Sequence, residues 1–130
     1  MGLDPRRGDI WYIWLDPTEG SEMAKRRRCV VVSHDAFGRD LDLRVIVPIT
    51  SWQPAFAKQP FLINIKPDAL NGLDKESAIN SFQMRCVSVN RFDDVNRAGI
   101  VSPQIVAKIA KAITVIVAYD YKDVKPEPTA

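Results

Sequence analysis

Between two apolar, strand-like segments lies a polar stretch, GSEMAKRRR at residues 20–28. It combines one carboxylate, Glu22, with four consecutive cations at residues 25–28. A row of cations binds a polyanion such as a phosphate backbone, and cutting that backbone also requires a proton acceptor. The residue types of this stretch therefore indicate polyanion binding. A solvated surface loop is the alternative interpretation of such a charge run.

The composition is that of a soluble globular protein, with 46% apolar and 26% charged residues in a chain of 130. This length suits one domain, residues 1–130, with a core at about 7–119. The net charge of +2 is too small to indicate nucleic-acid binding by itself. Since the chain has neither an apolar run of membrane-spanning length nor an apolar N-terminal segment, we expect a cytoplasmic protein without a membrane contact.

The cysteines and the histidine give little support to a metal centre. Cys29 and Cys86 each lie in an apolar, strand-like run, so we expect two buried free thiols and no disulfide. No pair of cysteines has the spacing of a zinc site, and His34 is the only histidine. We therefore expect neither a metal nor another cofactor, and His34 is a weak catalytic candidate.

Strands are the main elements that must position the polar stretch. Runs of aromatic and β-branched residues predict strands at 10–15, 29–33, 43–50, 61–65 and 77–82. Residues 85–89 form a sixth strand or continue the fifth beyond a kink. The connections are expected at 16–28, at 34–42 with one helical turn, and at 51–60. Pro48 has no N–H to donate, which predicts that its strand ends at a sheet edge or a bulge.

One amphipathic helix is predicted from about Pro103 to Ala118. Ser102 is a suitable N-cap, Pro103 suits the first helical position, and apolar residues recur at helical spacing up to Val117. The tail after Tyr121 has little to bury and is expected to be disordered. Several short strands followed by one helix predict a mainly β fold, a small antiparallel β barrel with a C-terminal helix.

Several blocks of the sequence, taken in order, resemble the MazF/PemK/Kid family of bacterial toxins. They are GDIW at 8–11, Asp16-Pro17, Gly20-Ser21-Glu22, Arg27, VVVS at 30–33, VPITS at 47–51, and Ser77 followed by Gln83 and Arg85. The resemblance spans about residues 7–118. It implies an SH3-like barrel, a homodimer, and a metal-independent endoribonuclease that cuts single-stranded RNA. It also implies a cognate antitoxin whose disordered segment occupies the RNA groove.

The resemblance assigns the chemistry to three residues. Arg27 is expected to stabilise charge on the reacting phosphate, and Thr50 to hydrogen-bond a phosphate oxygen. Glu22 either accepts the proton of the RNA 2′-OH or orients Arg27. The products would be a 2′,3′-cyclic phosphate and a 5′-OH. The further candidates for RNA binding are Ser21, Lys25, Arg26, Arg28, Ser51, Trp52, Phe56 and Gln83, of which Trp52 and Phe56 offer rings for base stacking.

The sequence also departs from the family pattern, and two other functions stay open. Arg28 stands where the family usually has proline, and Ser21 where the Kid-like branch has histidine. Asn80 and Phe82 occupy the positions of that branch's third-block arginine and aspartate. One alternative is a non-enzymatic toxin of the same barrel that binds gyrase. The other is a catalytically decayed homologue that binds RNA without cutting it.

Overall fold

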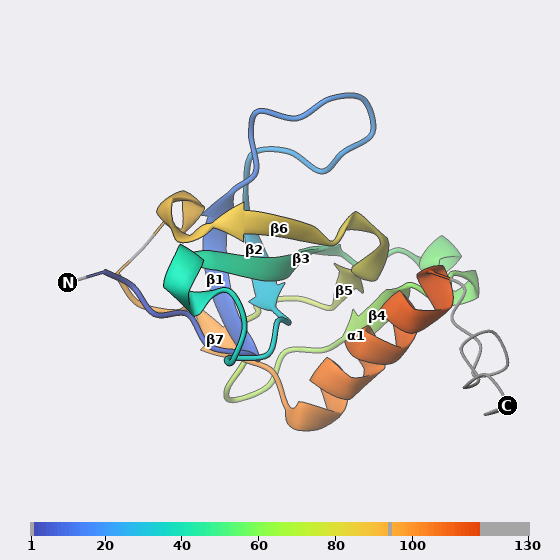
Figure 1. Cartoon of the computed structure of the whole chain (residues 1–130). Helices are drawn as coiled ribbons and strands as arrows, with labels where there is room; N and C mark the ends of the chain where they lie inside the picture. The colour runs from blue at the N-terminus through green and yellow to red at the C-terminus, as the bar shows by residue number, and fades with distance from the viewer. Residues whose placement is uncertain (1, 94, 118–130) are drawn as a thin grey trace, which may run out of the picture.

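The computed structural model describes residues 2–93 and 95–117. Within these residues a curled antiparallel sheet carries one C-terminal helix (Figure 1). The strands are β1 (Asp9–Trp14), β2 (Arg26–Val31), β3 (Leu43–Ser51), β4 (Leu62–Ile65), β5 (Ser77–Asn80), β6 (Arg85–Ser88) and β7 (Gly99–Ile100). The helix is α1 (Pro103–Ile116). The predicted mainly β fold with a C-terminal helix is confirmed.

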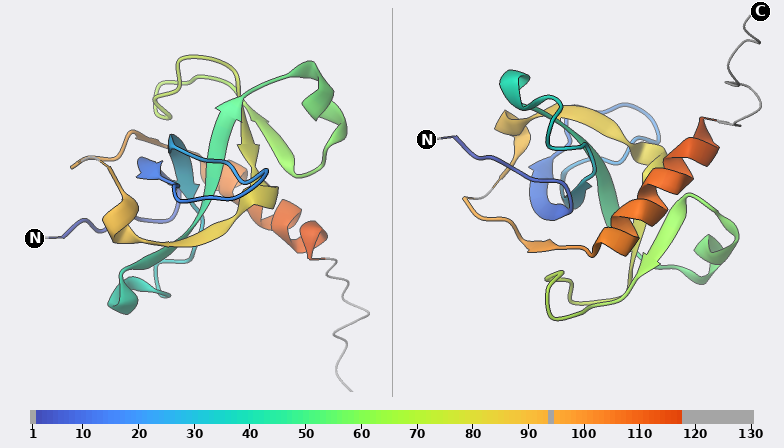
Figure 2. Two further views of the ribbon diagram at one scale, coloured as in Figure 1. Left: turned by 90° about the horizontal axis from the view of Figure 1, so that it is seen from above. Right: turned by 60° about the horizontal axis from the view of Figure 1, so that its bottom comes forward.

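The central strand β3 links the two parts of the sheet. The strand order is β4-β5-β3-β2-β1-β7, and β6 also pairs with β3. The first half of β3, Leu43 to Ile46, pairs with β6, whereas its end, Ile49 to Ser51, pairs with β5. Figure 2 shows the sheet curling as β3 passes from one part to the other, with α1 lying across the curl. Because β6 is a separate strand, the alternative of a continued fifth strand is excluded.

The prediction that Pro48 marks a sheet edge or a bulge is wrong, because Pro48 lies inside the central strand. It stands opposite Cys29 of β2. On the other side of β3, the pairing with β6 ends at Ile46 and the pairing with β5 begins at Ile49. Pro48 therefore occupies the change of partner, where the missing N–H does not interrupt either of these two ladders.

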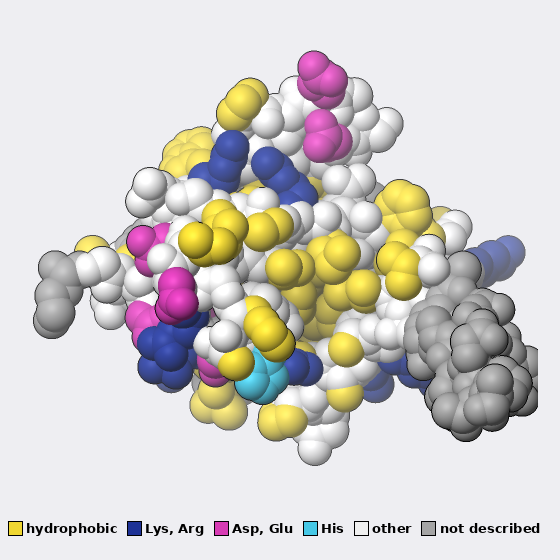
Figure 3. Space-filling model, in the orientation of Figure 1, with side chains coloured by type: hydrophobic (Ala, Val, Ile, Leu, Met, Phe, Trp, Pro, Cys, Tyr) yellow, Lys and Arg dark blue, Asp and Glu magenta, His cyan; other side chains and the backbone are white. Residues whose placement is uncertain are grey.

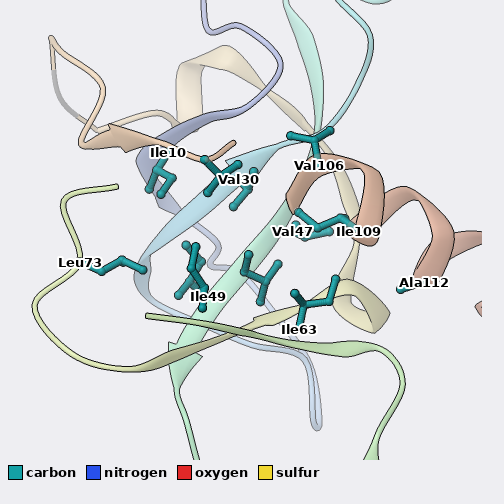
Figure 4. Packing of buried hydrophobic residues seen from close by; sticks show 12 residues of the cluster. Ile10, Val30, Val47, Ile49, Ile63, Leu73, Val106, Ile109 and Ala112 are labelled. Atoms are coloured by element: carbon teal, nitrogen blue, oxygen red, sulfur yellow. The ribbon is translucent and has the colours of Figure 1, made fainter. Parts of the chain in front are cut away.

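Two hydrophobic clusters form the core, one on each face of the strands. The alternation in β1 divides them: Ile10 belongs to the cluster under α1, whereas Trp11 and Ile13 belong to the cluster on the other face. Figure 4 shows Ile10, Val30, Val47 and Ile63 meeting the helix residues Val106, Ile109 and Ala112. The curled sheet thus buries side chains on both of its faces, which fixes the register of each strand.

The start of α1 follows the sequence prediction closely. The Ser102 hydroxyl accepts a hydrogen bond from the Ile105 N–H at 3.2 Å, and Pro103 is the first helical residue. Lys108 and Lys111 are exposed, as the helical spacing predicts. The helix ends at Ile116. Ala118 and the tail after Tyr121 lie outside the described residues. Within the described part of the chain, no helix is long and apolar enough to cross a membrane.

The N-terminal segment supplies partners for a buried arginine of the central strand. Arg44 of β3 is only 4% exposed, and its Nε donates to the carbonyl oxygen of Pro5 at 2.9 Å. A terminal nitrogen of the same guanidinium lies 3.1 Å from a carboxylate oxygen of Asp4. Asp4 also pairs with Arg6 and Arg39. Residues 4–6 are thereby fastened to the side of the sheet.

Several local predictions need correction. The expected loop at 16–28 ends earlier, because β2 begins at Arg26. The expected loop at 51–60 contains a 3₁₀ helix, Pro54–Lys58, and the fifth strand ends at Asn80 before a second 3₁₀ helix, Ser81–Gln83. The short strand β7 was not predicted. Cys29 is buried as expected, but Cys86 is exposed, because it lies on the part of β6 that α1 leaves uncovered.

Candidate active site

An opening between two strands forms the candidate site. The strands β1 and β2 remain paired as far as Trp14 and Arg26, whereas the pairing of β2 with β3 stops at Cys29 and Pro48. Beyond that point β3 follows β5. A pocket of about 210 Å³ lies where the two strands part, and it is lined by Tyr12, Arg26, Arg27, Arg28, Ile49, Thr50, Ser51, Leu73, Lys75 and Ser77.

The lining of this pocket is cationic and rich in hydrogen-bond donors. Four of its side chains are cations, from Arg26, Arg27, Arg28 and Lys75, and three more carry aliphatic hydroxyl groups, from Thr50, Ser51 and Ser77. None of the described lining residues is acidic. Such a combination matches the charge and the acceptor oxygens of a phosphate group.

The strand register brings Arg27 and Thr50 to the same place. Cys29 faces Pro48 across β2 and β3, and continuing this register by two positions sets Arg27 level with Thr50. Both side chains are half-buried and both line the pocket. The Arg27 Nε donates to the carbonyl oxygen of Ala24 at 3.0 Å, which holds the arginine against the β1–β2 loop. Within residues 2–93 and 95–117, its terminal nitrogens make no hydrogen bond and can therefore bind a ligand.

Arg26 and Arg28 project from the other face of β2, because side chains alternate along a strand. Both guanidinium groups lie over the Tyr12 ring, with the Arg26 Cζ 3.9 Å and the Arg28 Cζ 5.6 Å from the ring centroid. The three consecutive arginines are therefore not equivalent. Arg27 shares its side of the opening with Thr50, and the other two form a stack with Tyr12.

The β1–β2 loop, residues 15–25, is tied to the 3₁₀ helix at Ser81–Gln83. The Gln83 side chain accepts a hydrogen bond from the Met23 N–H at 3.1 Å and donates to the Ser21 carbonyl oxygen at 3.3 Å. Gln83 thus contacts the loop backbone and does not line the pocket. Lys25 is exposed in the left-handed region, with φ 69°. In Figure 3 acidic side chains stand on this protruding loop.

Glu22 does not meet Arg27. Its carboxylate accepts a hydrogen bond from the Glu19 N–H at 2.7 Å, so it closes a turn within its own loop. No ion pair between Glu22 and Arg27 is present among the described residues, and Glu22 does not line the pocket. In this conformation the loop carboxylate does not take the orienting role considered from the sequence.

The expected base-stacking residues lie beside the pocket and not in it. Trp52 follows β3 and Phe56 belongs to the 3₁₀ helix at Pro54–Lys58; their ring centroids are 5.8 Å apart in an edge-to-face arrangement. Both side chains are half-buried. Another ring pair, Phe61 and Phe82, is separated by 5.2 Å, and Phe82 is 62% exposed.

The model of the family described as "PemK-like, MazF-like toxin of type II toxin-antitoxin system" matches residues 6–117. The chain belongs to this toxin family. The match contains all of the strands and α1, and it includes every residue that lines the pocket.

Relatives of known name support this assignment. Endoribonuclease MazF9 of Mycobacterium tuberculosis is 34% identical over 114 residues, which cover 83% of this toxin and 92% of that protein. Endoribonuclease PemK of Escherichia coli is 46% identical over 48 residues, which cover 37% of this toxin and 36% of that protein. The fold resembles the crystal structure of MazF from Deinococcus radiodurans, with a TM-score of 0.74 at 18% identity, covering 90% and 99% of the two chains.

Five lining residues of the toxin were missed by the sequence reasoning: the apolar Ile49 and Leu73, and the polar Tyr12, Lys75 and Ser77. Tyr12 had a weak signal, because it alternates with the apolar residues of the first predicted strand and therefore faces away from Trp11 and Ile13. Ser77 belongs to the family pattern but was not assigned to the site, and Lys75 had no signal; both reach the pocket because β5 pairs with the end of β3.

The remaining candidates lie outside the pocket. Burial raises the pKa of the Cys29 thiol to about 12, against the lowering effects of Arg27 and Arg85, so this thiol stays protonated at neutral pH. His34 is exposed, and its Nδ1 accepts a hydrogen bond from the Ala36 N–H at 3.0 Å. Among residues 2–93 and 95–117, no three histidine, cysteine or acidic residues gather as a metal site would require.

Proposed function

We propose that this toxin is an endoribonuclease that cuts single-stranded RNA without a metal ion. The observation that carries the proposal is the joint position of Arg27 and Thr50 in a cationic pocket without acidic lining residues. The named relatives, endoribonucleases MazF9 and PemK, support the reaction class. RNA carries its own nucleophile, the 2′-OH, so that the protein needs to position the phosphate, stabilise charge and accept the 2′-OH proton.

The proposed reaction is an internal transfer of the phosphoryl group. The 2′-oxygen attacks the phosphorus atom and loses its proton, while the bond from phosphorus to the 5′-oxygen breaks and that oxygen takes up a proton. The products are a 2′,3′-cyclic phosphate and a 5′-OH. Arg27 would stabilise the added negative charge on the phosphate, and the Thr50 hydroxyl would donate to one of its oxygens.

Glu22 stays the candidate proton acceptor, but it would have to move to reach the RNA. Because its carboxylate is engaged by the Glu19 N–H and does not line the pocket, it can reach the 2′-OH only after a rearrangement of the β1–β2 loop. We propose that RNA binding causes this rearrangement. The cations of the pocket would then supply the larger part of the rate enhancement. Proton transfer to Glu22 would supply the smaller part, a factor of roughly 10² or more.

The proposed partners are a cognate antitoxin and a second copy of the chain. The structural neighbours include an endoribonuclease in complex with its cognate antitoxin from a mycobacterial species, with a TM-score of 0.65. Hydrophobic side chains gather between β6 and α1 in Figure 3, and Met84 and Val115 are exposed at 42% and 56%. We propose that a homodimer covers part of this surface, which analytical ultracentrifugation would test.

The deciding experiment incubates purified, antitoxin-free protein with a long single-stranded RNA in EDTA. Primer extension maps the cuts, and chemical analysis identifies the ends. We expect discrete cuts with cyclic phosphate ends that disappear in Arg27→Ala and remain weak in Arg27→Lys, which keeps the charge but loses the planar pair of donors. Intact RNA with a folded wild-type protein would refute the proposal and favour gyrase binding or a decayed homologue.

A further inference from the structure

Arg26 and Arg28 are both neutralised by aspartates of this chain that lie just outside the pocket. The Arg26 Nε donates to the Asp93 carboxylate. Arg28 donates to the Gly72 carbonyl oxygen at 3.1 Å and lies 3.3 Å from the Asp74 carboxylate. Carboxylate oxygens thus occupy donors of two of the three arginines that line the pocket. Arg27, in contrast, has no ion pair within the described residues.

Asp93 is held at this place by β1. Its N–H donates to the carbonyl oxygen of Tyr12 at 2.7 Å, next to an isolated bridge between Ile13 and Phe92. The Asp93 side chain nevertheless remains 45% exposed. The carboxylate therefore stands beside the Tyr12 stack, attached through the backbone but free to turn toward water.

Asp74 is presented by a rigid turn. The buried Asn71 accepts hydrogen bonds from the Asp68 and Leu73 N–H groups, at 3.2 and 3.0 Å, and donates to the Lys66 carbonyl oxygen at 2.9 Å. The turn thereby fixes the Gly72 carbonyl, whereas the Asp74 side chain is 77% exposed. A backbone hydrogen bond and the neighbouring Arg28 lower the pKa of Asp74, so it is ionised at neutral pH.

We propose that Arg26 and Arg28, stacked on Tyr12, form a second phosphate subsite, and that Asp93 and Asp74 reduce its affinity for RNA by competing with the RNA phosphate. This inference rests on the proposed function. It assigns a regulatory role to Asp93 and Asp74, which lie outside the site of Arg27 and Thr50. Since guanidinium groups already cover the Tyr12 ring, this ring would orient the arginines and would not stack on a base.

The competition predicts that removing a negative charge tightens RNA binding at this site in particular. The variants are Asp93→Asn, Asp74→Asn and their combination, which keep the shape of each side chain. The matched control is Asp40→Asn, which removes one negative charge from an exposed site preceding β3, at the end remote from Thr50. The probe is a fluorescent RNA of mixed sequence with 2′-O-methyl groups throughout, so that it binds but cannot be cut.

We expect each pocket variant to bind the probe about two- to fivefold more tightly than the wild type, and the double variant to gain more. Asp40→Asn should change the affinity much less. The double variant should also depend more steeply on salt, because solution anions then replace the aspartates and are released on binding. The inference would be overturned if Asp40→Asn raised the affinity for the probe as much as Asp93→Asn, or if the double variant bound the probe no more tightly than the wild type.

Binding of this probe, taken together with the cleavage assay on unmodified RNA, separates this inference from the proposed function. Wild-type protein that cuts RNA while the aspartate variants bind no tighter would refute the subsite and leave the ribonuclease intact. Tighter binding by the variants without any cleavage would support the subsite and refute the ribonuclease.

Tyr12 is tested separately as a positioning residue. Tyr12→Leu should weaken probe binding roughly fivefold, whereas Tyr12→Phe should retain it. Equal binding of both variants would exclude that role.

Discussion

The side chain of Gln83 is hydrogen-bonded to the backbone N–H of Met23, 3.1 Å away and 60 positions earlier in the chain. A second bond to the Ser21 carbonyl oxygen makes the contact bidentate. One amide group thus joins the 3₁₀ helix at Ser81–Gln83 to the loop that carries Glu22. The position of this loop depends on Gln83 more than on any contact that Glu22 makes with the pocket.

Gln83→Ala should loosen the loop without unfolding the sheet. Losing both hydrogen bonds removes about 1 kcal/mol of local stability, so the Met23 amide should exchange its hydrogen roughly fivefold faster. Gln83→Glu is the matched control, because it keeps the acceptor for Met23 and loses only the donor to Ser21. Hydrogen exchange measured by NMR tests this. Equal protection of Met23 in the wild type and Gln83→Ala would show that the loop is held elsewhere.

Thr50→Val should reduce the rate of cleavage while leaving the fold intact, since valine keeps the branched shape and loses the hydroxyl. Removing one donor to a developing oxyanion typically costs roughly 10²-fold in kcat. Thr50→Ser should retain most of the activity. Single-turnover cleavage of an RNA with one mapped site tests this. A Thr50→Val protein with unchanged kcat would remove Thr50 from the proposed chemistry.

Asp4→Asn should lower the stability at neutral pH but not in acid. Desolvation raises the pKa of Asp4, but Arg39, Arg6 and Arg44 lower it by more, so it lies below its ordinary value of 3.8. Because the folded-state pKa is the lower one, the carboxylate stabilises the protein above pH 3.8, and this contribution is lost as the pH falls through the folded-state pKa.

Since the Asp4 side chain is 41% exposed, the expected loss at pH 7 is only about 1 kcal/mol. Urea unfolding of the wild type and Asp4→Asn over a pH series measures it. The two stability curves should converge toward about pH 2, where the carboxylate of the wild type is protonated. A difference that stays constant over the whole series would assign the effect to packing and not to charge.

Gly72→Ala should destabilise the protein strongly and weaken the frame that holds Arg28. Gly72 has φ +67°, and a Cβ there would stand 2.3 Å from the carbonyl oxygen of Ala98. We expect a loss of at least about 2 kcal/mol in the free energy of unfolding. Gly20→Ala is the matched control, since Gly20 has φ +56° but open space around it. Thermal unfolding that affects both variants equally would contradict the role of the close contact.

Sequence reasoning identified the first five strands and the helix because their patterns are local, whereas it left β6 open and missed the two-residue strand β7. The boundary at Arg26 was missed for a physical reason: three successive arginines look like a solvated loop, yet they continue β2 because they pair with β1 on one side after the pairing with β3 has stopped at Cys29. Cys86 was misjudged because the apolar run around it does not reveal that α1 leaves this part of β6 uncovered.

The pocket itself was predicted only in part. Arg27 and Thr50 followed from the family resemblance, and their common location agrees with the β2–β3 register. Lys75 and Ser77 join them because β5 pairs with the end of β3, and a single sequence does not state which strands pair. The conformation of Glu22 depends on a turn within its own loop, so its distance from Arg27 was equally beyond prediction.

The placement of the arginines on β2 has a consequence for variation among related toxins. Because Arg26 and Arg28 are two positions apart on a paired strand, the backbone fixes the distance between their Cα atoms. Exchanging the β1–β2 loop between relatives would alter what surrounds the opening without changing that distance. An insertion inside β2 would change it even if every charge were kept. The strand β2 would thus set the spacing of the phosphate contacts, and the sequence of the β1–β2 loop could change without altering that spacing.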